Sequence, residues 1–160
     1  MLVATALAMA LLGHPHAKVA PSTRRYAAGV WTLTVHSDGF TGATTCSVRS
    51  SRIVIRRDTA IFELDPNKST DHAQFRIDGG AARSVQDVTL ENARHGVFPD
   101  RGWIDNPSGG EIAVPVTDIA NAKRIWIRVW RHGRVVSFNV NHLGEVLRSA
   151  AGLGCPATAL

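Results

Sequence analysis

Apolar and polar residues alternate with a period of two along most of the chain from Gly29 onward, and turn-forming residues interrupt the alternation at short intervals. This pattern is typical of half-buried β-strands joined by short connections. The strands that it predicts span residues 29–35, 44–49, 52–56, 60–64, 73–78, 111–116, 124–131 and 134–140. The sequence therefore predicts a mainly β protein, either an antiparallel β-sandwich or a strongly bent sheet.

The clearest local prediction is a hairpin formed by residues 124–131 and 134–140. His132-Gly133 separates these two strands, which is the spacing of a tight turn. If Arg131 faces Arg134, the apolar pairs are Val129 with Val136, Ile127 with Phe138, and Ile125 with Val140. This face must point to the core, and the opposite face pairs Trp130 with Val135, Arg128 with Ser137, and Trp126 with Asn139.

Two helices are predicted near the end of the chain. Thr117 has the position of an N-cap for a short helix over 118–122. A second helix, capped by Asn141 and continuing to Ala151, is amphipathic, and its apolar side consists of Leu143, Val146, Leu147 and Ala150. Residues 85–94, within the irregular segment 81–107, fit either a helix or a loop with a short strand, and we favour the loop.

The first residues of the chain form an apolar run, 1–13, which has the length of a signal-peptide core and is too short to cross a bilayer. We expect cleavage between Ala17 and Pro21, so that 1–20 is a signal peptide and 21–160 a single domain. A buried N-terminal helix is the alternative. Export would place the chain in the periplasm or outside the cell, where Cys46 and Cys155 would form a disulfide.

Charge narrows the classes of partner. The chain has 18 basic and 13 acidic residues. The predicted leader contains one basic residue, Lys18, so the remaining domain has 17 basic and 13 acidic residues and a net charge of +4. This excess favours weak attraction to anionic envelope polymers. The arginines are spread through the predicted strands beside Asp and Glu residues rather than gathered into a stripe, and export would separate the protein from nucleic acid, so a nucleic acid is not expected as a partner.

Side chains for cofactor or metal binding are not evident in the sequence. The pairs Gly79-Gly80 and Gly109-Gly110 fit turns, since neither opens a helix after a strand as a phosphate-binding loop does. The two cysteines lack a CxxC spacing, and no two histidines have ligand spacing on one element. We therefore expect no cofactor and no metal.

Four alternating residues, Arg124, Trp126, Arg128 and Trp130, form the strongest candidate binding site. Flat aromatic rings can stack on sugar rings, and guanidinium groups between them can hold acidic groups. The alternative is that a second sheet or the helix covers this row, with arginines stacked on the tryptophans as ordinary packing.

A small envelope hydrolase acting on a glycan or ester is the alternative to a binding module. Asp100, Asp105 and Glu111 could act as paired carboxylates. The dipeptide Asp71-His72 could activate a serine such as Ser69 or Ser84, but no GxSxG motif singles out a nucleophile. We therefore expect a protein that is not an enzyme.

Several segments together resemble a known family. They are Trp31, Cys46, Trp103-Ile104-Asp105-Asn106-Pro107, Gly109-Gly110, Val114-Pro115-Val116, Ile127-Arg128-Val129 and Gly154-Cys155-Pro156. This combination resembles the invasion-associated locus B-like family of small exported proteins of Gram-negative bacteria. The resemblance implies a periplasmic or surface β-sandwich without known catalytic residues and with a role in host-cell association. We expect a non-enzymatic module that binds an envelope protein or an anionic envelope glycan, or a structural accessory of an envelope complex.

Overall fold

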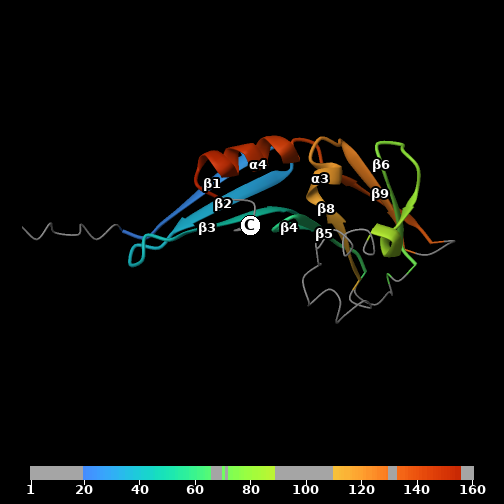
Figure 1. The fold of residues 1–160 in the computed structure, drawn as a ribbon, viewed down its shortest axis with the longest axis horizontal. Helices are drawn as coiled ribbons and strands as arrows, with labels where there is room; N and C mark the ends of the chain where they lie inside the picture. The colour runs from blue at the N-terminus through green and yellow to red at the C-terminus, as the bar shows by residue number, and fades with distance from the viewer. Residues whose placement is uncertain (1–19, 66–69, 71, 89–109, 130–132, 156–160) are drawn as a thin grey trace, which may run out of the picture.

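The computed structural model of the chain describes residues 20–65, 70, 72–88, 110–129 and 133–155. Its strands form two antiparallel sheets (Figure 1). Sheet A consists, in spatial order, of β1 (Ser22–Ala28), β2 (Trp31–Ser37), β3 (Thr44–Ser50), β4 (Ile53–Arg56), β5 (Thr59–Glu63) and β8 (Glu111–Pro115). Sheet B consists of β10 (Val135–Asn139), β9 (Arg124–Arg128), β6 (Gln74–Ile77) and β7 (Arg83–Ser84). The helices with defined bounds are α3 (Val116–Ile119) and α4 (Leu143–Gly152). The predicted mainly β fold with a C-terminal helix is confirmed.

Alternation along the strands of sheet A places one row of side chains in the core. Across the sheet, this row consists of Tyr26, Leu33, Val48, Ile55, Ala60 and Val114. All of its members except Tyr26, on the edge strand β1, are at most 1 % exposed. In β2, Trp31, Leu33 and Val35 are buried, in agreement with the alternation that predicted a half-buried strand at 29–35.

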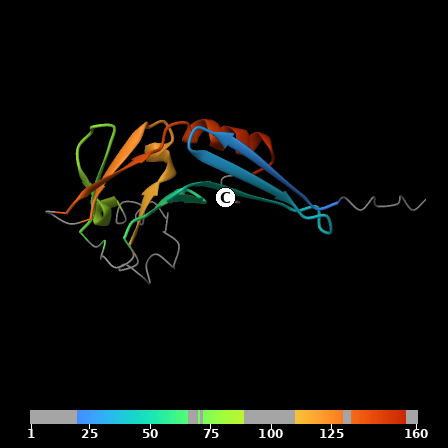
Figure 2. The same ribbon diagram turned by 180° about the vertical axis from the view of Figure 1, so that it is seen from behind.

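Two different elements cover the core side of sheet A. The helix α4 packs against β2 and β3 near one end of the molecule, and sheet B lies at the other end, as the two opposite views show (Figures 1 and 2). Phe62 of β5 and Phe138 of β10 meet edge to face between the sheets, with ring centroids 5.2 Å apart. One continuous core cluster includes residues of both sheets and of α4, which gives a sandwich-like arrangement.

A disulfide joins Cys46 of β3 to Cys155, three residues beyond α4, with their Cα atoms 5.9 Å apart. The predicted pairing is confirmed. The predicted apolar side of the helix is confirmed too: Leu143, Val146 and Ala150 are buried, and Leu147 packs against the core.

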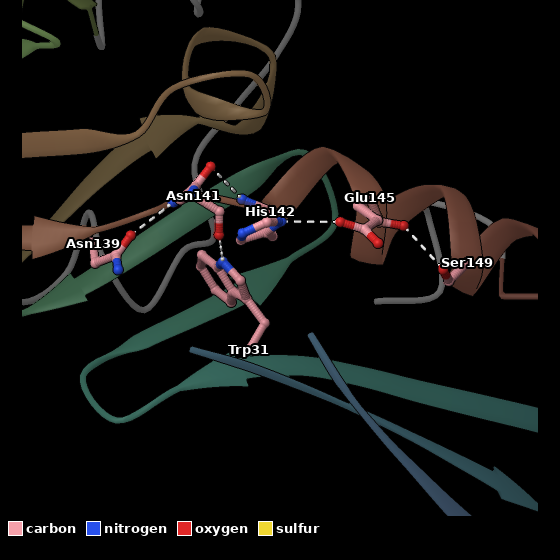
Figure 3. A network of polar contacts seen from close by, with 6 residues as sticks. All are labelled: Trp31, Asn139, Asn141, His142, Glu145 and Ser149. Carbon is pink, nitrogen blue, oxygen red and sulfur yellow. Dashed lines mark hydrogen bonds and ion pairs between the residues drawn. The ribbon is translucent and has the colours of Figure 1, made fainter. Parts of the chain in front are cut away.

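A chain of polar contacts fixes the start of α4 (Figure 3). The Trp31 indole N–H donates to the carbonyl oxygen of Asn141, 3.0 Å away. The Asn141 side-chain oxygen accepts from the backbone N–H of His142, and His142 Nδ1 lies 3.0 Å from the Glu145 carboxylate. The Ser149 hydroxyl then donates to the Glu145 carbonyl oxygen. These contacts connect the first buried strand to the last helix.

The register of the β9–β10 hairpin differs from the prediction by two residues. Phe138 lies opposite Ile125, and Trp126 lies opposite Ser137. The far end of the hairpin determines this register, because the Val140 N–H donates to the Lys123 carbonyl oxygen at 3.0 Å. The connection is consequently longer than the predicted two-residue turn. A shift of two preserves the faces, so the predicted core side of the hairpin is correct although the pairs are wrong.

Both predicted helix caps are wrong. The helix α3 starts at Val116 after Pro115, without a side-chain cap, so Thr117 lies inside it. The N-cap of α4 is His142, which adopts a left-handed conformation with φ 67°, and not Asn141. In both cases a tight connection from the preceding strand determines where the helix begins, rather than a capping side chain.

The structure differs from the sequence predictions in three further places. Strand β1 was not predicted, because its residues are polar and exposed along an edge strand that has no apolar row. The predicted strand 29–35 begins at Trp31, since Gly29, with φ 59°, belongs to the β1–β2 turn. Residues 85–88 are helical rather than a loop, and Val85 and Val88 are buried.

The packing at the start of α4 leads to a stability prediction at Gly144. Its N–H donates to the Ala120 carbonyl oxygen at 2.8 Å, and a Cβ at this position would lie 2.7 Å from the same oxygen. We expect Gly144→Ala to lower the free energy of unfolding by about 1–3 kcal/mol, measured by urea denaturation. Replacing a helical glycine that has no such close contact by alanine would instead raise the free energy of unfolding by up to about 1 kcal/mol.

Gly152, at the end of the same helix, is the matched control. A Cβ there would meet no atom of the described structure within 4 Å. We expect Gly152→Ala to leave the unfolding midpoint unchanged or to raise it. If Gly144→Ala raised the midpoint as well, the close approach between α4 and the residues after α3 would be contradicted.

Candidate binding face on sheet B

The solvent side of sheet B carries arginine side chains around one tryptophan. On β9, Ile125 and Ile127 are fully buried, and the alternate residues Arg124, Trp126 and Arg128 point away from the core. The pairing of β9 with β6 adds Arg76 beside Trp126 and Gln74 beside Arg128. On the other side, β10 contributes Val135, Ser137 and Asn139 to the same face. We call this surface the Trp126 face.

Two guanidinium groups lie against the Trp126 ring. The Arg76 Cζ atom is 5.1 Å from the ring centroid, and that of Arg124 is 6.0 Å away. Such contacts stabilise exposed sites by about 0.5–1 kcal/mol each. Trp126 is half-buried, whereas Arg76, Arg124 and Arg128 are exposed. The ring therefore orders two arginines that keep their charged groups accessible.

A shallow hollow of about 400 Å³ lies beyond the β10 edge, and a smaller one of about 230 Å³ lies on the Trp126 face itself. The residues that line the smaller hollow are Gln74, Phe75, Arg76, Gly80, Ala82, Trp126, Arg128 and Val135. This set contains two arginines and no carboxylate. The electrostatic potential of the hollow therefore favours an anionic group.

The carboxylate of Asp78, near the Trp126 face, already has partners. It accepts hydrogen bonds from the backbone N–H groups of Lys123 and Arg124 at 2.8–3.1 Å. Asp118 pairs at 2.7 Å with Arg83, which lies opposite the buried Phe75 on the other side of sheet B. Among the described residues, a shifted pKa is found elsewhere, in the β2–β3 loop, where the Phe40 and Thr41 backbone N–H groups lower the pKa of Asp38. Within the part of the chain that the structure describes, no acidic side chain neutralises Arg76, Arg124 or Arg128.

The structure brings together Arg124, Trp126 and Arg128 from the predicted row, and Trp130 lies outside the described residues. Arg76 and Gln74 were not predicted as part of the site. Their outward positions follow from the alternation of strand 73–78, but the pairing of that strand with β9 is not visible in the sequence. The contacts of arginine with Trp126 agree with the alternative of cation–π packing, while the exposed guanidinium groups keep the face open to a ligand.

Most residues named for a hydrolase lie outside the described residues, namely Ser69, Asp71, Asp100 and Asp105. The Ser84 hydroxyl oxygen accepts a hydrogen bond from the Gln86 N–H, and His72 is exposed. Glu111 lies opposite Glu63 at the end of the β5–β8 pair. Among the described residues, no group of three His, Cys, Asp or Glu side chains could hold a metal ion.

The fold and the face define a class: a two-sheet β protein with one disulfide and a cationic surface centred on a tryptophan. Comparison of the chain with protein-family models, with curated proteins and with solved structures finds no match. None of the helices in the described ranges is both long and apolar enough to cross a membrane.

Proposed function

We propose that the protein is an exported, non-enzymatic binding module that recognises an anionic carbohydrate of the bacterial envelope through the Trp126 face. The observation that carries this proposal is the position of Arg76 and Arg124 against the Trp126 ring, at 5.1 and 6.0 Å from its centroid. The Cys46–Cys155 disulfide supports the proposed export, because disulfides persist in oxidising compartments.

The chemistry of the face suits an acidic sugar. An indole ring offers an apolar surface against which the C–H groups of a sugar ring can pack. A guanidinium group beside it can bind a carboxylate or phosphate through two parallel hydrogen bonds. The two arginines nearest the ring come from different strands, β6 and β9, so a ligand lying on Trp126 would meet cationic groups from two strands.

The shape of the hollow favours a polymer over a small, enclosed ligand. Pockets that bury a small molecule usually have about 300–1,000 Å³, whereas the hollow on the Trp126 face has about 230 Å³. Such a site would contact one sugar ring from one side. Affinity would then come from repeated units of the polymer, which raise the effective concentration of the next ring.

The proposal can be tested with an acidic polymer and its neutral form. The oxidised full chain is titrated with polygalacturonate and with methyl-esterified polygalacturonate by isothermal calorimetry. We expect binding of the acidic polymer alone, with an affinity that falls as salt is added. Equal binding of both polymers would contradict recognition of the acidic group.

Variants locate the interaction. We expect Trp126→Ala to weaken binding of the acidic polymer about tenfold, a loss of about 1.4 kcal/mol, and Arg76→Gln to weaken it and reduce the salt dependence. The matched control is Arg25→Gln, which removes one exposed arginine from β1 in sheet A. If the control weakened binding as much as Arg76→Gln, net charge rather than the Trp126 face would explain the binding.

A further inference from the structure

We infer that the outer edge of β10, which pairs with no other strand among the described residues, accepts an extended acidic peptide as an additional strand of sheet B. This site uses backbone groups at the end of the sheet and the groove beside them, and it adjoins the Trp126 face, to which Val135, Ser137 and Asn139 of the same strand belong. A peptide and a polysaccharide are separate probes, and either interaction can fail without the other.

The backbone of β10 has one side that sheet B does not use. This strand is the last in the order β10-β9-β6-β7. The Val140 N–H donates to the Lys123 carbonyl oxygen at 3.0 Å, which makes Val140 and Lys123 a hydrogen-bonded pair. Because such pairs alternate in an antiparallel ladder, Phe138 and Val136 also bond to β9, and the N–H and C=O groups of Ser137 point outward.

The same alternation turns the backbone groups of Val135 and Asn139 outward. No backbone hydrogen bond between described residues uses the outward groups of Val135, Ser137 or Asn139. A row of unused donors and acceptors at a sheet edge is a template for another strand. The edge thus offers three residues of pairing, with Ser137 at the centre.

A groove of about 400 Å³ runs beside this edge and gives the added strand a place for its side chains. Its apolar lining comes from Val136 and Phe138 of β10, from Ile53 of β4, and from Val30 in the β1–β2 turn, which is 41 % exposed. The Arg52 guanidinium lies 5.5 Å from the centroid of the Phe138 ring. The groove therefore combines an apolar floor with a positive charge at its wall.

Pairing at this edge dictates which peptide residues face which side. Residues opposite Val136 and Phe138 would point into the groove, where small apolar side chains fit. Residues opposite Val135, Ser137 and Asn139 would lie on the side of the Trp126 face, in rows that continue to Arg128 and Arg124. An added strand would lie roughly 10 Å from β9, two strand spacings away, within reach of arginine and glutamate side chains extended toward each other.

Charge selects an acidic peptide over a second copy of this chain. Pairing of two β10 edges would bring the Arg124 and Arg128 rows of both copies onto one surface, and like charges on one sheet face repel. The net charge of +5 adds to this repulsion. A segment in which carboxylates alternate with small apolar residues would pair with the β10 backbone, place its apolar side chains in the groove, and bring its carboxylates toward the arginines.

The test uses a seven-residue peptide of alternating glutamate and valine, acetylated and amidated at its ends, and the oxidised, ¹⁵N-labelled full chain. We expect perturbed amide signals along β10 and slower hydrogen exchange at Ser137. The same peptide N-methylated at the residues whose N–H groups face β10 should bind at least about tenfold more weakly. Equal binding of the N-methylated peptide, or no binding of either peptide, would overturn the proposal.

Two variants at one position test the edge from the side of the protein. Ser137→Pro removes the outward N–H and leaves the bonds to β9 intact, as proline is tolerated on edge strands. Ser137→Thr keeps the N–H and is the matched control. We expect the proline variant to lose at least about tenfold in affinity and the threonine variant to bind as the unmodified chain does. Equal affinities of the two folded variants would overturn the proposal, and the N-methylated peptide decides the question if the proline variant does not fold.

Discussion

Replacing Phe62 by alanine will lower the free energy of unfolding by about 3–5 kcal/mol, which is a large part of the total stability of a domain of this size. Phe62 is fully buried and meets Phe138 edge to face at 5.2 Å. Because these rings belong to different sheets, their contact joins sheet A to sheet B. Removing the Phe62 ring would leave a cavity between the sheets, which rigid strands can fill only in part.

Chemical denaturation of the purified, oxidised chain measures this loss. Phe40→Ala is the control, because Phe40 is 96 % exposed in the β2–β3 loop and its replacement should change stability by no more than about 0.5 kcal/mol. A loss below about 1 kcal/mol for Phe62→Ala would contradict the packing of the two sheets around this ring.

Removing the disulfide will have the second large effect. The bond joins residues 109 positions apart, and the loss of a native disulfide typically costs about 2–5 kcal/mol. We expect the double variant Cys46→Ala, Cys155→Ala to unfold at a correspondingly lower denaturant concentration. The backbone amides of α4 should also exchange faster with solvent, since the disulfide fixes the end of this helix to β3.

The control for this experiment is the effect of a reductant. Reductant should shift the unfolding midpoint of the unmodified chain toward that of the double variant and leave the double variant unchanged. A double variant as stable as the oxidised chain would show that packing of α4 alone holds the helix in place.

Features of the fold that depend on local patterns could be predicted from the sequence. Alternation of apolar residues gave the core side of β2 and of the β9–β10 hairpin, and helical spacing gave the buried side of α4. The pairing of Cys46 with Cys155 followed from there being two cysteines in the chain. In these cases the information lies in the pattern of neighbouring residues or in the number of cysteines.

Features that depend on distant residues could not be predicted. The register of β10 is determined by Val140 bonding to Lys123 at the far end of the hairpin, and the polar edge strand β1 forms because β2 lies beside it. For the site, the sequence predicted Arg124, Trp126 and Arg128 as one row, but Arg76 joins them through the pairing of β6 with β9. That pairing leaves no periodic signal along the chain.

The bonds between the first strands and the last residues have a consequence for biosynthesis. The core side of β2 and β3 is covered by α4, and two connections close this contact: the Cys46–Cys155 bond, and the hydrogen bond from Trp31 to Asn141 across 110 positions. Ribosomes add about 5–20 residues per second, so Leu33 and Val48 stay exposed for several seconds until the segment that covers them has been synthesised. The amino-terminal half therefore cannot bury this apolar surface before the carboxy-terminal segment has been added.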